Sequence, residues 1–236
     1  MSAPEIGTAP RVLYGRRRGR SLRPGQRLLV ETRLPALRIA VPRDGVLDPR
    51  RLFAAPVAAV WLELGFGGGE HLAAQAALHP EIGMLGAEVF ENGVAKLLAE
   101  MQRRSLENIR LFVDDGRLLL AALPDGAVAR VFILFPDPWP KARHAKRRLV
   151  SRDTLDALAR IMADGGELRL ATDDMDYARA MLALGTTHRD FRWCAQSARD
   201  WRARADDWPP TRYEQKALAA GRLPLYLRFA RLPRAH

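Results

Sequence analysis

One segment of the chain combines residue types that could do chemistry. An apolar run from Val131 to Phe135 is followed by the pentapeptide PDPWP at residues 136–140. Prolines lack the N–H group that a central strand needs, so the chain must leave the sheet here, with Asp137 and Trp139 on a stiffened loop. Ligands bind at the carboxyl ends of the strands in an open parallel sheet. The loop therefore predicts a small reactive site with one carboxylate and one aromatic ring.

A basic cluster without any acidic residue follows this loop. It contains six side chains that could contact a polyanion: Lys141, Arg143, His144, Lys146, Arg147 and Arg148. Residues 1–60 contain 12 basic and 4 acidic side chains, residues 61–135 contain 6 and 10, and residues 136–236 contain 20 and 13. This segregation predicts a positive surface around an acidic pocket, as expected for a nucleic-acid partner. Compositional drift in an arginine-rich chain is the alternative.

A glycine-rich turn separates a predicted strand from a predicted helix. Gly65, Gly67 and Gly69 permit a tight turn and let a ligand approach the backbone at the helix N-terminus, although such a turn can also serve packing alone. Glu88 closes the next predicted strand, where a carboxylate can accept hydrogen bonds from the two hydroxyls of a ribose. Together these residues favour a nucleoside ligand.

Two features distinguish the nucleoside ligands that such a turn could bind. The third glycine comes two residues after the second, not three as in the dinucleotide fingerprint. Glu63 precedes the first glycine, where its charge would attract a cationic ligand such as S-adenosylmethionine, which has a sulfonium and an ammonium group. Asp115, after the third predicted strand, could lie near an adenine amino group or could only cap the next helix.

Strand-like and helix-like segments alternate from Val57 onward. We expect strands at residues 57–64, 82–89, 109–113, 128–135 and 166–171, and helices at 69–78, 91–103, 116–123, 153–163 and 175–184. This alternation predicts βαβ units and a mostly parallel sheet. Residues 191–195 and 225–231 have the composition of a closing strand pair, one member of which could run antiparallel.

The N-terminal segment has a different composition from the remainder. Residues 1–50 are rich in Gly, Pro and Arg, and residues 14–20 concentrate positive charge. We predict a flexible basic arm at residues 1–50, with a short amphipathic element at 28–40, and a single domain at residues 51–236. The arm could bind nucleic acid or could be a solvated tail.

The chain resembles the bacterial tRNA (guanine-N7-)-methyltransferases from Gly15 to Phe229. The resemblance is carried by Glu63-x-Gly-x-Gly-x-Gly, Glu88, Asp115, the sequence FPDPWPKARHAKRR at 135–148, ATDD at 171–174 and TRYE at 211–214. It implies a Rossmann-like class I methyltransferase fold, of the α/β class, with a mostly parallel seven-stranded sheet and helices on both faces. It also implies methyl transfer from S-adenosylmethionine to N7 of a variable-loop guanine of tRNA.

The resemblance also implies roles for individual residues. The cofactor would be contacted by Glu63, Glu88, Asp115 and Asp137 beside the turn glycines Gly65, Gly67 and Gly69, and Asp137 would also be the catalytic residue. Substrate would be bound by Lys141, Asp173, Thr211, Arg212, Tyr213 and Glu214. RNA would be contacted by Arg143, His144, Lys146, Arg147 and Arg148, and the charge of the N-terminal segment adds Arg16, Arg17 and Arg18 as candidate RNA contacts. The chain departs from the family in having Phe90 where a His is usual, and Lys216-Ala217 where an Arg-Gly pair is usual.

The reaction itself fits these residue types. N7 of guanine has a free lone pair and no proton, so attack on a sulfonium methyl needs alignment more than a general base. Asp137 could orient the guanine and stabilise the positive charge that develops on it. Trp139 could stack on a base or could pack within its loop.

Some of the implied substrate residues also have a purely structural interpretation. Thr211 and Glu214 have the spacing of a capping box, in which both side chains satisfy backbone donors of a helix. Asp173 or Asp174 could cap the helix expected from Met175. A cap and a substrate contact are compatible roles for one side chain.

The sequence leaves two alternative functions open and limits the cellular location and the kinds of site that we expect. A dehydrogenase with a dinucleotide cofactor is one rival, and a catalytically silent RNA-binding protein with the same fold is the other. Cys194 is the single cysteine, no apolar run approaches the ~18 residues that span a bilayer, and the histidines lack metal-ligand spacing. We therefore expect a cytoplasmic protein, monomeric or homodimeric, without a metal site or a membrane segment.

Overall fold

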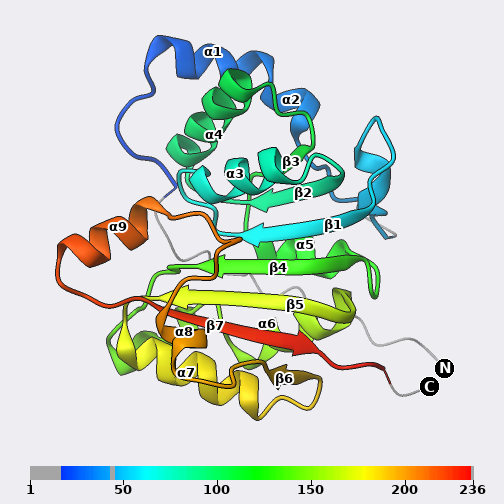
Figure 1. Cartoon of the computed structure of the whole chain (residues 1–236). Coiled ribbons are helices and arrows are strands. Elements are labelled where there is room, and N and C mark those ends of the chain that lie inside the picture. Colours follow the sequence, from blue (N-terminus) through cyan, green and yellow to red (C-terminus); the bar gives the residue numbers. More distant parts are fainter. Residues whose placement is uncertain (1–16, 43–45, 235–236) are drawn as a thin grey trace.

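The computed structural model contains one seven-stranded sheet (Figure 1). It describes residues 17–42 and 46–234. The strand order is β3-β2-β1-β4-β5-β7-β6. The strands are β1 Ala59–Leu64, β2 Ile82–Ala87, β3 Ile109–Phe112, β4 Val128–Leu134, β5 Met162–Thr172, β6 Phe191–Trp193 and β7 Leu225–Arg231.

The strand directions confirm the predicted α/β fold with a mostly parallel sheet. β1 pairs in parallel with β2 and β4, and further parallel pairs join β2 to β3 and β4 to β5. β7 is antiparallel to both of its neighbours, as expected for one member of the closing pair. The order reverses between β1 and β4, so the loops that leave these two strands diverge and leave a crevice at their carboxyl ends.

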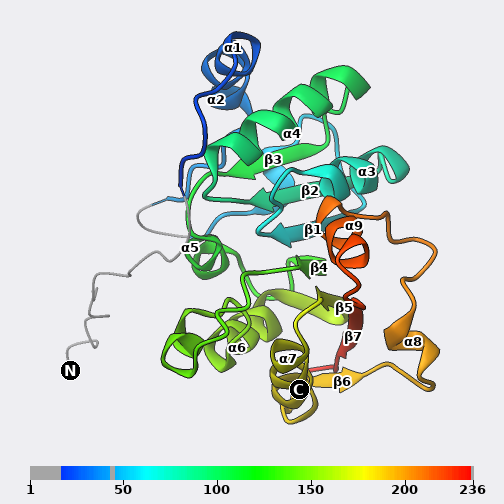
Figure 2. The ribbon, with the colours of Figure 1, turned by 90° about the vertical axis from the view of Figure 1, so that its left-hand side faces the viewer.

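Helices cover both faces of the sheet (Figures 1 and 2). One buried cluster joins alternate residues of β1 to α5, α6 and α7, and a second joins the opposite face to α3 and α4. The two clusters arise because successive side chains of a strand point to opposite faces. The helices are α3 Glu70–Leu78, α4 Glu91–Arg104, α5 Gly116–Ala122, α6 Arg152–Ile161, α7 Met175–Thr186, α8 Arg199–Arg202 and α9 Arg212–Ala219, with 3₁₀ turns η1 Pro49–Leu52 and η2 Ala142–Arg147.

Part of the segment predicted to be a flexible arm is packed against the domain. Helices α1 Pro24–Thr32 and α2 Leu34–Leu37 lie beside α4 (Figure 1), and Leu34 is buried in the same cluster as α4. The Ile39 N–H donates to the Leu111 carbonyl oxygen at 2.8 Å. Arg16 and the residues before it lie outside the described residues. The domain boundary at residue 50 stays a prediction.

A helix that crosses a bilayer is about 20 residues long and predominantly apolar. Among the residues that the structure describes, none of the helices is both long enough and apolar enough to cross a bilayer.

Candidate active site

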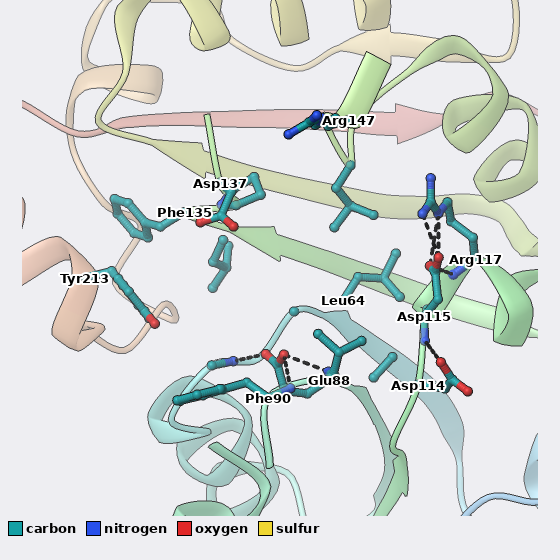
Figure 3. A pocket seen from close by; sticks show the side chains of 18 of the residues that line it. Leu64, Glu88, Phe90, Asp114, Asp115, Arg117, Phe135, Asp137, Arg147 and Tyr213 are labelled. Carbon is teal, nitrogen blue, oxygen red and sulfur yellow. Dashed lines mark hydrogen bonds and ion pairs between the residues drawn. The ribbon is translucent and has the colours of Figure 1, made fainter. Parts of the chain in front are cut away.

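A cavity of about 350 Å³ lies at the carboxyl ends of β1, β2, β3 and β4 (Figure 3). Its volume is within the range of sites that bind small molecules. Residues from the glycine turn, the ends of β2 and β3, the 135–139 loop and α9 line it: Leu64, Gly65, Gly67, Ala87, Glu88, Val89, Phe90, Asp114, Asp115, Gly116, Arg117, Leu134, Phe135, Pro136, Asp137, Trp139, Arg147, Leu149 and Tyr213.

The glycine turn forms one wall because its backbone cannot accommodate side chains. Gly65, Gly67 and Gly69 have φ angles of 74°, 56° and 79°, in the left-handed region that favours glycine. A Cβ atom on Gly67 would lie 2.9 Å from Cε2 of Tyr213. A Cβ atom on Gly93, in the first turn of α4, would lie 2.0 Å from the carbonyl oxygen of Gly67. The turn is therefore enclosed by close contacts on two sides.

Glu88 is fixed in the cavity wall by backbone donors. Its Oε2 accepts a hydrogen bond from the Gly67 N–H at 2.7 Å, and its Oε1 accepts from the N–H groups of Val89 at 2.7 Å and Phe90 at 2.9 Å. Burial raises the pKa of Glu88 above that of an ordinary glutamate, although these three hydrogen bonds lower it, and the charge of Asp137 raises it further. The carboxylate is thus preorganised and partly desolvated.

Asp115 occupies the same cavity at the end of β3. Its Oδ1 accepts from the Arg117 backbone N–H at 3.0 Å, so it is the N-cap of α5. The Arg117 guanidinium also donates to both carboxylate oxygens, at 2.6 to 3.0 Å. Asp115 is therefore both a helix cap and a cavity-lining residue, and the two roles suggested by the sequence are compatible.

The 135–139 loop is strained at both ends. Phe135 and Trp139 have φ angles of 51° and 45°, which residues with a side chain rarely adopt. The Arg148 Nε atom donates to the carbonyl oxygen of Pro138 at 2.8 Å, inside the loop. Asp137, between the two strained residues, is exposed and faces Glu88 across the cavity (Figure 3). Packing around the loop thus holds one accessible carboxylate at the cavity mouth.

Residues of the basic cluster have two different environments. Arg147 lies with its guanidinium 5.0 Å from the centre of the Trp139 ring, and His144 packs edge-on against that ring. Arg148 stacks over Tyr177 at 4.8 Å. By contrast, the side chains of Lys141, Arg143 and Lys146 are exposed. Part of the cluster therefore supports the loop, while the remainder faces solvent.

The TRYE segment begins α9, and its capping box is confirmed. Thr211 Oγ1 accepts from the Glu214 N–H at 3.0 Å, and Glu214 Oε2 accepts from the Thr211 N–H at 3.2 Å. Glu214 Oε1 also accepts from the Tyr226 hydroxyl at 2.7 Å. Within this segment only Tyr213 is among the residues that line the cavity. The cap thus fixes the helix that presents Tyr213.

Other residues predicted for the site lie outside the cavity lining. Glu63 is buried under α3, where its Oε2 lies 2.7 Å from Nδ1 of His71. Asp173 forms an ion pair with Arg222 at 2.7 Å, and Lys141 is exposed directly before η2. Gly69 packs against Leu97 of α4. Contacts of these residues with a cofactor or substrate stay predictions.

The cavity also contains residues to which the sequence analysis gave no role. Arg117, Phe135 and Leu149 line it. Phe135 is the last residue of a predicted strand, which was a usable signal. Nothing in the sequence indicated that Arg117 and Leu149 line the cavity, because their positions depend on the path of the chain around Asp115 and after η2. Among residues 17–42 and 46–234, no group of three His, Cys, Asp or Glu residues could hold a metal ion.

Comparison with solved structures identifies the fold class. A 16S rRNA (adenine(1408)-N(1))-methyltransferase from Catenulisporales acidiphilia matches with a TM-score of 0.51 and 15% sequence identity, over 80% of this chain and 100% of that chain. The protein therefore has the class I methyltransferase fold, as predicted.

Sequence comparison identifies the family. A family model described as "Putative methyltransferase" matches residues 57–225. A tRNA (guanine-N(7)-)-methyltransferase of Rhodospirillum rubrum is 54% identical over 98% of this chain and 92% of its own length, and one of Paramagnetospirillum magneticum is 50% identical over 94% and 93%. The chain belongs to the tRNA (guanine-N(7)-)-methyltransferase family. It is a methyltransferase, which excludes the dehydrogenase alternative.

Proposed function

We propose that this protein transfers the methyl group of S-adenosylmethionine to N7 of the variable-loop guanine of tRNA. The observation that carries the proposal is the pairing of a backbone-fixed Glu88 with an accessible Asp137 across one cavity, next to exposed basic side chains. The names of the relatives support the same substrate and the same atom.

The residues of the cavity fit the adenosine part of the cofactor. Glu88 is placed to accept hydrogen bonds from ribose hydroxyls, and Gly65 has open space where a side chain would lie, so a ligand can approach its backbone. Asp115 would lie beside the adenine of the cofactor. When bound, the cofactor supplies an electrophilic methyl group on a positively charged sulfur. Glu63 is proposed to contact the cofactor, as the family resemblance implies, while its Oε2 contacts His71.

Asp137 is proposed to act on the guanine. N7 needs no deprotonation, so the task of the carboxylate is to orient the base and to stabilise the positive charge that methylation leaves on it. The left-handed backbone at Phe135 and Trp139 fixes the direction of the loop before the base arrives. Asp137 is therefore a catalytic residue through charge and alignment, without acting as a general base.

Binding of the RNA is proposed to use the exposed cations around the cavity. A guanine within folded RNA must be unstacked, which costs a few kcal/mol, and phosphate contacts elsewhere can supply that energy. Lys141, Arg143 and Lys146 are exposed near the 135–139 loop. Arg17 and Arg18 are exposed on the N-terminal side.

The remaining roles come from the family. We propose that Asp173, Thr211, Arg212 and Glu214 shape the guanine site, and that Tyr213 contacts substrate directly from the cavity wall. A tRNA-modifying enzyme of this kind would work in the cytoplasm, as a monomer or a homodimer.

The test is incubation of the purified protein with radiolabelled S-adenosylmethionine and unmodified tRNA, followed by nucleoside analysis. We expect label in 7-methylguanosine with the wild type and none with Asp137→Ala. Label in another nucleoside would overturn the substrate assignment. Tight tRNA binding without any label would favour a silent RNA-binding protein.

A further inference from the structure

A short N-terminal segment, residues 17–20, crosses the beginning of α4, and we call it the strap. Asn92 Oδ1 accepts a hydrogen bond from the Gly19 N–H at 2.7 Å, and Asn92 Nδ2 donates to the Arg20 carbonyl oxygen at 2.6 Å. The Glu91 N–H donates to the Arg17 carbonyl oxygen at 3.0 Å. One asparagine amide therefore binds the strap backbone as a neighbouring strand would, with a donor and an acceptor.

Two side chains of the strap reach two different loops. The Arg18 Nε atom donates to Glu91 Oε1 at 3.0 Å, at the start of α4, while Arg17 lies 3.7 Å from Asp114, after β3. All four side chains are substantially exposed, and exposed ion pairs contribute little by themselves. The hydrogen bonds of Asn92 are therefore the stronger attachment, and the ion pairs set the direction of the strap.

The loops that the strap joins form the adenosine side of the cavity. Phe90 and Asp114 both line it; the Phe90 N–H donates to Glu88, and Asp114 directly precedes Asp115, and both of these carboxylates contact cofactor in the proposed function. Gly19 lies directly against Phe90, because a Cβ atom on Gly19 would be 3.0 Å from Cζ of that ring and 2.7 Å from Asn92 Oδ1. The strap thus supports the outer side of the Phe90 wall.

We propose that Asn92 is a positioning residue that fastens the strap across the adenosine end of the cavity, so that the strap holds Phe90 and Asp114 in place around the cofactor. The proposal rests on the proposed function, which places adenosine between Glu88 and Asp115. It assigns residues 17–20 a role at the cofactor, in addition to any contact that their arginines make with RNA.

The adenosine half is common to the methyl donor and to its product, S-adenosylhomocysteine. A wall around that half must affect both ligands by the same factor, whereas a change near the methyl group would alter their ratio. Calorimetric Kd values for both ligands, measured without RNA, therefore separate this role from one in RNA binding and from one in methyl transfer.

The first variant is Asn92→Ala, with Lys96→Ala as the matched control, since Lys96 is exposed on the same helix. Loss of two hydrogen bonds from a partly exposed site should raise both Kd values by about three- to tenfold. The ratio of the two Kd values and kcat at saturating cofactor should stay unchanged, and Lys96→Ala should bind both ligands as the wild type does.

The second variant, Gly19→Ala, approaches the same contact from the strap. Its new Cβ atom would push the strap away from Asn92 and Phe90 without removing any side chain of the domain. We expect the same rise in Kd. Both variants break the same contact between Gly19 and Asn92. The double variant should therefore have Kd values no higher than those of either single variant, and this non-additivity cannot come from two unrelated losses.

A proteolysis experiment gives a readout independent of affinity. Saturating S-adenosylhomocysteine should slow trypsin cleavage after Arg20 in the wild type, and Asn92→Ala should lose that protection. Unchanged Kd values in both variants, or a rise only in the KM for tRNA, would overturn the inference while leaving the proposed function intact. A wild-type protein that binds neither ligand would overturn the proposed function, and this inference with it.

Discussion

The two carboxylates that face each other across the cavity are held in opposite ways. Glu88 accepts three hydrogen bonds from backbone N–H groups and follows directly from the end of β2. Asp137 is exposed, and its loop is held by a strained backbone and by Arg148. The cofactor end of the site is therefore built by the sheet and its turns, while the acceptor end depends on side chains that follow β4.

This difference predicts separable defects. Changes in the glycine turn and at Glu88 should weaken cofactor binding, whereas changes in the 135–139 loop should slow methyl transfer at saturating cofactor. Defects that always appear together would show that the two ends are one rigid unit.

The largest effect is expected for Asp137→Ala. Removal of a group that stabilises charge in the transition state typically lowers kcat by roughly 10²- to 10³-fold. Asp137→Asn keeps the shape of the side chain and removes its charge, so it should lose nearly as much if charge is what matters. Single-turnover methyl transfer to tRNA measures both. An Asn variant with wild-type rates would show that only orientation is needed.

The glycine turn offers a matched pair of variants. Gly65→Ala and Gly67→Ala both force an alanine into left-handed backbone, which costs roughly 1–2 kcal/mol. Gly67→Ala also places a Cβ atom against Tyr213, while the space beside Gly65 is open. Because the backbone is already left-handed at both positions, we expect each variant to lose roughly 1–2 kcal/mol of unfolding free energy, and we expect the cofactor Kd to rise more for Gly67→Ala than for Gly65→Ala. Titration calorimetry provides the ranking, and equal effects would argue against a role for the Tyr213 contact.

A smaller effect is expected for Arg148→Ala. The variant loses the hydrogen bond to Pro138 and the stacking on Tyr177, so the loop should be less well fixed and kcat should fall by about 5- to 10-fold, the scale of one lost hydrogen bond. Cofactor Kd should not change.

Arg143→Ala is the comparison because the Arg143 side chain is exposed. This variant should raise the KM for tRNA and weaken the salt dependence of that KM. Identical kinetics for the two variants would contradict the division within the basic cluster.

The smallest effect is a pH dependence of cofactor binding. Burial raises the pKa of Glu88, so its protonated form is favoured in the folded protein. The group therefore contributes stability below its unfolded pKa, and that contribution is lost as the pH rises through the folded pKa. Ribose hydroxyls need the ionised form as an acceptor, so cofactor affinity should fall a few-fold on acidification, starting above the ~4.3 of an ordinary glutamate. Glu88→Gln should bind the cofactor weakly at every pH. A pH dependence of cofactor affinity that persists in this variant would come from another group.

The fold and most of the cavity could be predicted from the sequence because their signals are local. Alternating apolar segments indicated the strands, and the glycine spacing indicated the turn. Glu88 lies at the end of one predicted strand, and Asp115 and Asp137 each lie two residues after another. Parallel strands bring such positions to one edge regardless of the details of packing.

Other parts of the site were beyond sequence reasoning because they depend on distant contacts. Glu63 points to the face of β1 covered by α3, where His71 is its partner, a contact that the sequence did not indicate. The contact of Asn92 with Gly19 joins residues 73 positions apart. Only the folded arrangement of the chain brings these partners together.

The central claim, methyl transfer to N7 of one guanine in the variable loop of tRNA, is tested most directly by locating the product in the RNA. Reduction with borohydride followed by aniline treatment cleaves RNA at 7-methylguanosine, so the reacted tRNA can be mapped on a sequencing gel. We predict one new cleavage, at a variable-loop guanine, that is absent with Asp137→Ala. Cleavage at other guanines, or methylated tRNA that is not cleaved, would contradict the account.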